Sequence, residues 1–201
     1  MPLVERAECL RHLEPLLVGT PSAFRNAVKR MRHAPPEDLI DRTSRSGSNL
    51  TRDYAVAELE KLWRDNSDVR IYSHGLLKLF VAKETYLIRV KKLDRYSRSS
   101  NHSSGQDWRF RFQQPFPGMP RYIHLELGYV PNLLRTAVDD VQLVCLNGHR
   151  VYWSHSIENP SHNLYDLLQG MPDPNLQGPK PTPKQPDDGV SEPTVKIKPK
   201  K

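Results

Sequence analysis

The sequence predicts an α+β fold: N-terminal helices, then a mostly antiparallel sheet of about six strands, then a disordered C-terminal tail. Three observations support this. Apolar residues recur with a helical period in the first third of the chain, and the period changes to two after residue 68. From residue 172 to 201, eight of thirty residues are proline and large apolar side chains are almost absent. Such a segment cannot bury enough surface to offset its ordering entropy.

The length of 201 residues predicts one domain with an appendage. We divide the chain into an N-terminal helical segment at 1–48, an α+β core domain at 49–170 and a disordered Pro/Lys-rich tail at 171–201. Without the tail, about 170 residues remain, which is enough for one hydrophobic core.

Two helices are predicted before the core domain. Residues 3–17 form an amphipathic helix that Pro15 ends or bends, because proline lacks a backbone donor. Thr20 then caps a second helix with Pro21 at its first position. The pair suggests either a helix-turn-helix or a small helical lid on the core, and the lid is favoured because no third helix is clearly defined. A long amphipathic helix is predicted at 50–66, capped by Ser48 or Asn49.

The strands follow from alternation and turn signals. Apolar and polar residues alternate in a predicted antiparallel meander at 69–72, 76–81 and 86–92, and again at 122–130, 141–146 and 150–157. Asn147-Gly148 is a strong hairpin signal. The sequence predicts a polar loop at 94–105. At 108–113 it predicts either a strand or the entry to a helix. We expect the helices on one face of the sheet.

Composition excludes several classes of protein. Cys9 and Cys145 are the only cysteines, so neither a disulfide framework nor a cysteine-rich zinc site is predicted, and this usage suits a reducing cytosol. We see no signal peptide and no apolar run long enough to span a membrane. We therefore expect a cytoplasmic protein without a metal or a cofactor. The net charge of +7 fits a nucleic acid, an acidic protein partner or simply a soluble surface.

Basic residues gather around the third predicted strand. Between Lys83 and Arg111 there are eight basic residues and three acidic ones. Cations neutralise phosphates, and Trp108 or Tyr96 can stack on a base. The predicted contact surface for nucleic acid or an acidic protein partner comprises Arg89, Lys91, Lys92, Arg95, Arg98, Trp108, Arg109 and Arg111. The alternative is a solvated sheet face, or an Arg89 paired with a helix carboxylate such as Glu58.

Two enzymatic functions are the alternatives. The helix and the meander ending in a lysine-bearing strand resemble the core of PD-(D/E)xK nucleases, which need an aspartate and a Glu-x-Lys to hold magnesium. Here Arg89 stands two residues before Lys91, and 76–81 carries no carboxylate. The chain can still be a degenerate relative of these nucleases that keeps their scaffold and lacks their catalytic residues. His124 and Glu126 share a strand face and could serve a metal-free ribonuclease together with an arginine.

One further resemblance rests on several short segments: LIRVKKLD, RSSN at 98–101, FPGMP, LELGYV, and the hairpin VQLV with NGHRVYWS. Together they resemble small bacterial proteins associated with loci that encode helix-turn-helix regulators and ImmA/IrrE-type peptidases. Those loci belong to toxin–antitoxin or phage-defence systems. The resemblance covers about 53–157 and carries no established catalytic residues.

The function predicted from the sequence is therefore a non-enzymatic binding or regulatory component of such a locus, acting through the basic strand and loop. The alternative is a ribonuclease-type toxin or a degenerate PD-(D/E)xK-like nuclease. The sequence indicates no oligomeric state.

Overall fold

The computed structural model describes residues 3–33, 43–74, 77–100 and 104–159. All of them belong to the first of two units, Met1–Gly170 and Met171–Lys201. The predicted tail at 171–201 lies outside the described residues. The elements are α1 (Arg6–Leu17), α2 (Thr20–Arg32), α4 (Ser44–Leu62), β1 (Val69–His74), β2 (Leu77–Ala82), β3 (Tyr86–Lys92), α5 (Gly105–Arg111), β4 (Ile123–Pro131), β5 (Val138–Asn147) and β6 (Arg150–Ser156).

The strands form one sheet in the order β1-β2-β3-β4-β5-β6. Neighbouring strands are antiparallel except β3 and β4, which run parallel. A parallel pair needs a long crossover connection, and here that connection carries α5. The predicted α+β class with a mostly antiparallel sheet is confirmed, but the parallel pair was not foreseen.

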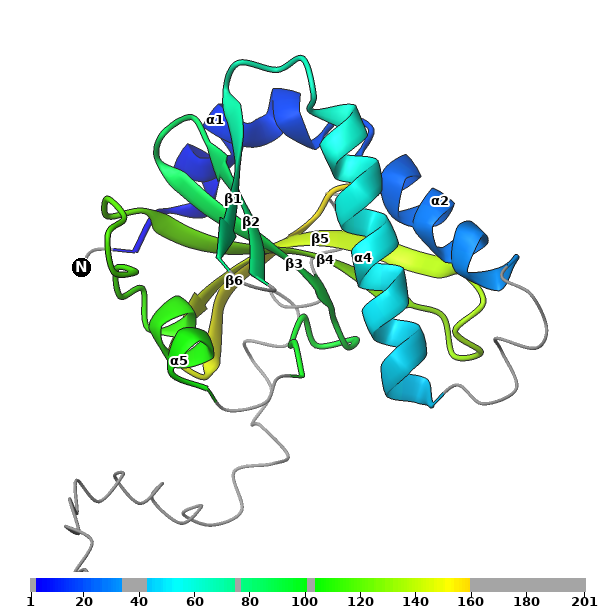
Figure 1. Ribbon diagram of the computed structural model, residues 1–201. Coiled ribbons are helices and arrows are strands. Elements are labelled where there is room, and N and C mark those ends of the chain that lie inside the picture. Colours follow the sequence, from blue (N-terminus) through cyan, green and yellow to red (C-terminus); the bar gives the residue numbers. More distant parts are fainter. Residues whose placement is uncertain (1–2, 34–42, 75–76, 101–103, 160–201) are drawn as a thin grey trace, which may run out of the picture. The chain divides into compact units, whose positions relative to one another are not determined.

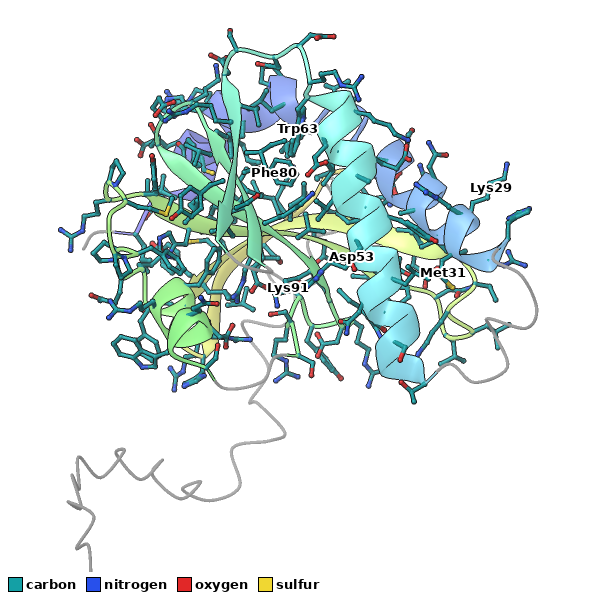
Figure 2. All side chains as sticks on the ribbon, in the orientation of Figure 1. Lys29, Met31, Asp53, Trp63, Phe80 and Lys91 are labelled. Atoms are coloured by element: carbon teal, nitrogen blue, oxygen red, sulfur yellow. The ribbon has the colours of Figure 1, made fainter. Side chains whose placement is uncertain are left out.

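One face of the sheet is covered by α1, α2 and α4, whose apolar residues share a single core with β2 to β6. Figure 1 shows α4 (cyan) crossing this face with α2 (blue) beside it. Trp63 packs edge-on against Phe80 with ring centroids 4.9 Å apart, between α4 and the sheet (Figure 2). The Trp63 indole N–H donates to the Leu16 carbonyl at 2.9 Å. The N-terminal helices thus pack on the core, as a lid would.

The expectation that helices lie on one face only is wrong. Phe110 of α5 is buried with Leu79, Val81 and Leu87 in a second cluster, on the face opposite to α1, α2 and α4. The reason is the β3–β4 crossover, which passes over that face and buries its own aromatic residues there. This places α5 over Arg89 of β3, whose guanidinium lies 3.9 Å from the centroid of the Phe110 ring.

Local capping explains where two helices begin. The Thr43 hydroxyl accepts a hydrogen bond from the Ser46 N–H at 3.1 Å, so α4 begins at Ser44, six residues before its predicted start. The Ser104 hydroxyl accepts from the Asp107 N–H at 3.1 Å and caps α5. The alternating segment 108–113 is therefore mainly helical. No helix in the described part of the chain is long and apolar enough to cross a membrane.

Gly128 of β4 permits a close approach that shapes the loop after β3. A Cβ at Gly128 would lie 2.5 Å from Cγ of Leu93 and 2.9 Å from the Lys91 carbonyl oxygen. Leu93 is 1% exposed, and its N–H donates to the Tyr129 carbonyl at 2.9 Å. The chain therefore stays anchored to β4 for one residue beyond β3 before it turns into the polar loop.

A candidate nucleic-acid interface above a buried charge network

The side chains of β3 alternate between the two faces of the sheet. Ile88 and Val90 lie in the core beneath α4, and Lys92 follows them on that face, with Nζ 3.4 Å from the Ser48 hydroxyl of α4. Arg89 and Lys91 point to the face covered by α5. The cations of this strand are thus divided between two environments and do not form one surface.

Arg89 is buried in an ion pair with Glu126. The two residues are direct neighbours in the parallel register of β3 and β4. Nε and Nη2 of Arg89 donate to Oε1 of Glu126 at 2.9 and 2.5 Å. Arg89 is 4% exposed and Glu126 is fully buried. The Arg89 guanidinium also lies over the Phe110 ring, 3.9 Å from its centroid.

The Arg89–Glu126 pair belongs to a ring of hydrogen bonds that joins four segments of the chain. Nη1 of Arg89 donates to Asp107 Oδ1 of α5 at 2.8 Å, and Nε of Arg111 donates to Asp107 Oδ2 at 2.9 Å. Nη2 of Arg111 donates to the Ser99 carbonyl at 3.0 Å, and the Ser99 hydroxyl donates to Glu126 Oε1 at 3.0 Å. We call these five residues the buried network. It ties the loop at Ser99 to α5, β3 and β4.

The two carboxylates of the network are balanced by its two guanidinium groups. Glu126 Oε2 is buried and has no hydrogen-bond partner among the described residues. In the same part of the chain, no group of three or more His, Cys, Asp or Glu residues could hold a metal ion. The arrangement suits a scaffold, because each carboxylate already has a positive partner that would compete with a cation.

Lys91 lies at the edge of the network. Burial, and then the positive charge of Arg89, lower its pKa to about 8 from the ordinary 10.5, although Glu126 and Asp107 act in the opposite direction. The side chain is only half-buried, so Lys91 remains accessible next to the exposed loop.

His124 is enclosed on the same face. Its Nδ1 donates to the Phe110 carbonyl at 3.0 Å, and its ring stacks on Phe110 with centroids 4.8 Å apart. Burial lowers the pKa of His124 to about 4, outweighing the bond to the Phe110 carbonyl, which raises it. The imidazole is therefore neutral at pH 7. His124 is 1% exposed and Glu126 is 0% exposed, so neither of the two catalytic candidates reaches solvent.

The loop at 94–100, which we call the basic loop, exposes two arginines around one aromatic ring. The guanidinium groups of Arg95 and Arg98 each lie 4.9 Å from the centroid of Tyr96. Oδ1 of Asp94 accepts from the Tyr96 and Arg98 N–H groups at 2.8 and 2.9 Å, which fixes the turn. Both arginine side chains are exposed.

The outer side of α5 adds a second aromatic and basic group. Trp108 is 51% exposed and stacks on Phe112 with centroids 4.9 Å apart. Arg109 is exposed. Because Arg111 of α5 is bonded to Ser99 at the end of the basic loop, the two groups belong to neighbouring segments.

The eight residues predicted as one contact surface therefore differ in exposure and do not all lie on the same face of the sheet. Arg95, Arg98, Trp108 and Arg109 are exposed, and Lys91 is half-buried. Arg89 and Arg111 are not surface residues, since their side chains are only 5% and 12% exposed and are paired with carboxylates. Lys92 lies on the other face. The partner of Arg89 is not Glu58, which instead pairs with Lys61.

Asp107 and Ser99 were not among the site residues predicted from the sequence. The sequence does hold one local signal for Asp107, since Ser104 stands three residues before it as a helix cap would. No local signal exists for the Arg89–Glu126 pair, because it depends on the parallel register of two strands far apart in the sequence.

Comparison with known proteins adds little to this geometry. No protein-family model matches the chain, and no match was found among curated proteins. Among solved structures, the chain is similar to the restriction endonuclease BglI bound to its DNA recognition sequence, with 13% identity and a TM-score of 0.33. The similarity covers 81% of this chain and 75% of that one.

Proposed function

We propose that the protein binds nucleic acid, without cleaving it, through the basic loop and the outer side of α5. The observation that carries the proposal is the exposed arrangement of Arg95 and Arg98 around Tyr96. Guanidinium groups bind phosphate oxygens through paired, charge-assisted hydrogen bonds. On the outer side of α5, the exposed Trp108 ring offers a base a surface on which to stack.

The exposed groups rest on a rigid support. Ser99 closes the basic loop onto Glu126 and Arg111, and Asp107 closes α5 onto Arg89. A loop and a helix that are already ordered lose less conformational entropy when a ligand binds. In this account the buried cations hold the surface in place, and the exposed cations contact the ligand.

A binding role also agrees with the placement of the catalytic candidates. His124 and Glu126 are enclosed, and Arg89 occupies the position where a PD-(D/E)xK site would carry a carboxylate. We also propose that the protein has a regulatory role in a bacterial toxin–antitoxin or phage-defence locus. That part rests on the sequence resemblance alone.

The surface is tested by replacing Arg95, Arg98 and Arg109 together with glutamine. We expect binding to fluorescent single-stranded and duplex oligonucleotides to weaken at least tenfold in a polarization assay, because up to three phosphate contacts are lost. Circular dichroism and a melting curve establish that the variant folds. The matched control replaces Arg25, Lys61 and Arg70, which are 53%, 57% and 61% exposed, and removes the same charge elsewhere.

The control is expected to bind nearly as well as the wild type. An equal loss in both triple variants would show that only net charge matters and would overturn the proposed surface. A wild-type protein that captures an acidic protein and binds no oligonucleotide at physiological salt would overturn the choice of ligand.

A further inference from the structure

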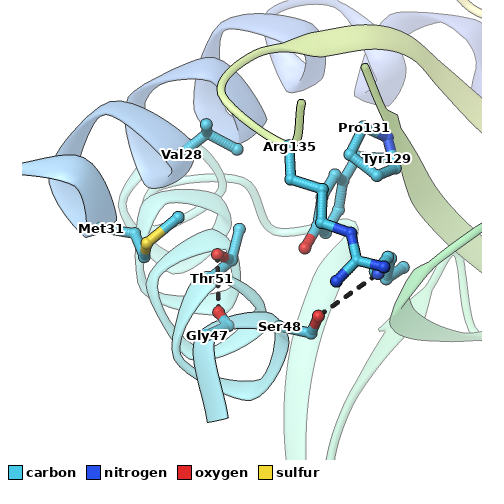
Figure 3. A pocket seen from close by; sticks show the side chains of 9 residues that line it. Val28, Met31, Gly47, Ser48, Thr51, Tyr129, Pro131 and Arg135 are labelled. Carbon is cyan, nitrogen blue, oxygen red and sulfur yellow. Dashed lines mark hydrogen bonds between the residues drawn. The ribbon is translucent and has the colours of Figure 1, made fainter. Parts of the chain in front are cut away.

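A small pocket lies on the opposite face of β3, where α2, α4 and the ends of β3 and β4 meet (Figure 3). One wall is apolar, formed by Val28 and Met31 of α2 with Pro131 of β4. Tyr129, which packs against Phe24 with ring centroids 5.7 Å apart, closes the pocket from the sheet. The wall offers an apolar group a small contact surface.

Two cations line the same pocket. Lys92 enters from the end of β3, with Nζ 3.4 Å from the Ser48 hydroxyl, and Arg135 enters from the loop after β4. None of the lining residues is acidic. Burial, and then the charge of Arg135, lower the pKa of Lys92, so each cation lies in the field of the other. An anion placed between them would relieve this repulsion.

The loop that carries Arg135 is held in shape by Asn132. Its Oδ1 accepts from the N–H groups of Thr136 and Ala137 at 2.7 and 3.2 Å, and the Arg135 N–H donates to the Asn132 carbonyl at 2.9 Å. Arg135 itself has a positive φ of 57°, an uncommon conformation for a residue with a side chain. The hydrogen bonds of Asn132 keep the loop in this conformation beside the pocket.

We propose that this pocket binds the phosphate group of a nucleotide, with Lys92, Arg135 and the Ser48 hydroxyl on the phosphate and the apolar wall on the base or sugar. The phosphate belongs either to a free mononucleotide or to the terminal phosphate of an oligonucleotide. This site lies on the face of β3 away from the buried network and does not depend on the proposed function of the basic loop.

Calorimetric titration of the full chain with AMP, adenosine and inorganic phosphate tests the pocket. We expect AMP to bind at least tenfold more tightly than adenosine or inorganic phosphate, because only AMP uses both the cations and the apolar wall. The double variant Lys92→Gln/Arg135→Gln is expected to lose at least tenfold in affinity for AMP. Met31→Glu, which places a negative charge on the wall, should lose a similar factor, whereas Met31→Leu should not.

A second arm compares oligonucleotides with a 5′-phosphate and a 5′-hydroxyl. A preference for the 5′-phosphate that disappears in Lys92→Gln/Arg135→Gln, without AMP binding, would assign the pocket to a chain end. The triple variant of the basic loop and α5 is expected to retain AMP binding, which separates this site from the proposed interface. Absence of AMP binding together with no 5′-phosphate preference, or unchanged affinity in both pocket variants, would overturn the proposal.

Discussion

Replacing Arg89 by methionine is expected to lower the free energy of unfolding by about 3–5 kcal/mol, the range found when one partner of a buried ion pair is removed. Glu126 is fully buried, and the substitution takes away the guanidinium that donates two hydrogen bonds to it. Asp107 keeps Arg111 as a partner, so the cost falls mainly on Glu126. Urea unfolding at pH 7 measures the change.

Two control variants distinguish the effect of losing the buried charge from the effect of losing packing contacts on the free energy of unfolding. Arg70→Met removes one side of the exposed Arg70–Glu84 pair and should cost at most about 1 kcal/mol. The double variant Arg89→Met/Glu126→Gln removes both charges of the pair and should recover part of the loss. A cost below about 1 kcal/mol for Arg89→Met would mean that the buried network does not hold the structure together.

The titration of His124 is expected to make the free energy of unfolding depend strongly on pH. The pKa of His124 is about 4 in the folded protein and near 6.5 when unfolded, so between these values the unfolded chain binds more protons. Stability therefore falls as pH drops from 6.5 to 4, and His124 contributes up to about 3 kcal/mol of that fall. In His124→Asn, whose amide can still donate toward the Phe110 carbonyl, this contribution should disappear.

The measurement is the free energy of unfolding of both proteins at pH values from 4 to 7. The difference between wild type and His124→Asn should narrow toward pH 4. Leu125→Ala, a substitution at a buried neighbour on β4, is the control and should lower stability by a similar amount at every pH. A His124→Asn profile parallel to that of the wild type would show that His124 does not titrate in this window.

Local sequence patterns, such as turn residues and the alternation of apolar and polar residues, predict most of the fold. The hairpin at Asn147-Gly148 forms where the turn residues predict it, with Gly148 at a φ of 62°, and β5 and β6 pair on either side. Alternation located the strands to within a few residues. At 108–113, alternation left a strand and the entry to a helix open. The structure has the helix, which ends at Arg111, and Trp108 stacks on the capping residue Phe112.

The candidate site could be predicted only in part. Arg95 and Arg98 follow the last residues of a strand in a polar segment, and this local pattern is enough to expose them. Arg89 shows the limit: alternation places it on one face of β3 but does not reveal that α5 covers that face. Its pairing with Glu126 requires the parallel register of β3 and β4, and Arg135 joins Lys92 only through the tertiary fold.

If the arginines of the basic loop contact phosphates, replacing one of them must change how the affinity for nucleic acid depends on salt concentration. The slope of log affinity against log salt concentration reports how many phosphates the protein neutralises. For Arg98→Gln, we expect a slope smaller in magnitude than that of the wild type by about 0.7–0.9, and for the exposed control Lys61→Gln we expect no change. An unchanged slope in Arg98→Gln, or the same change in Lys61→Gln, would contradict these phosphate contacts.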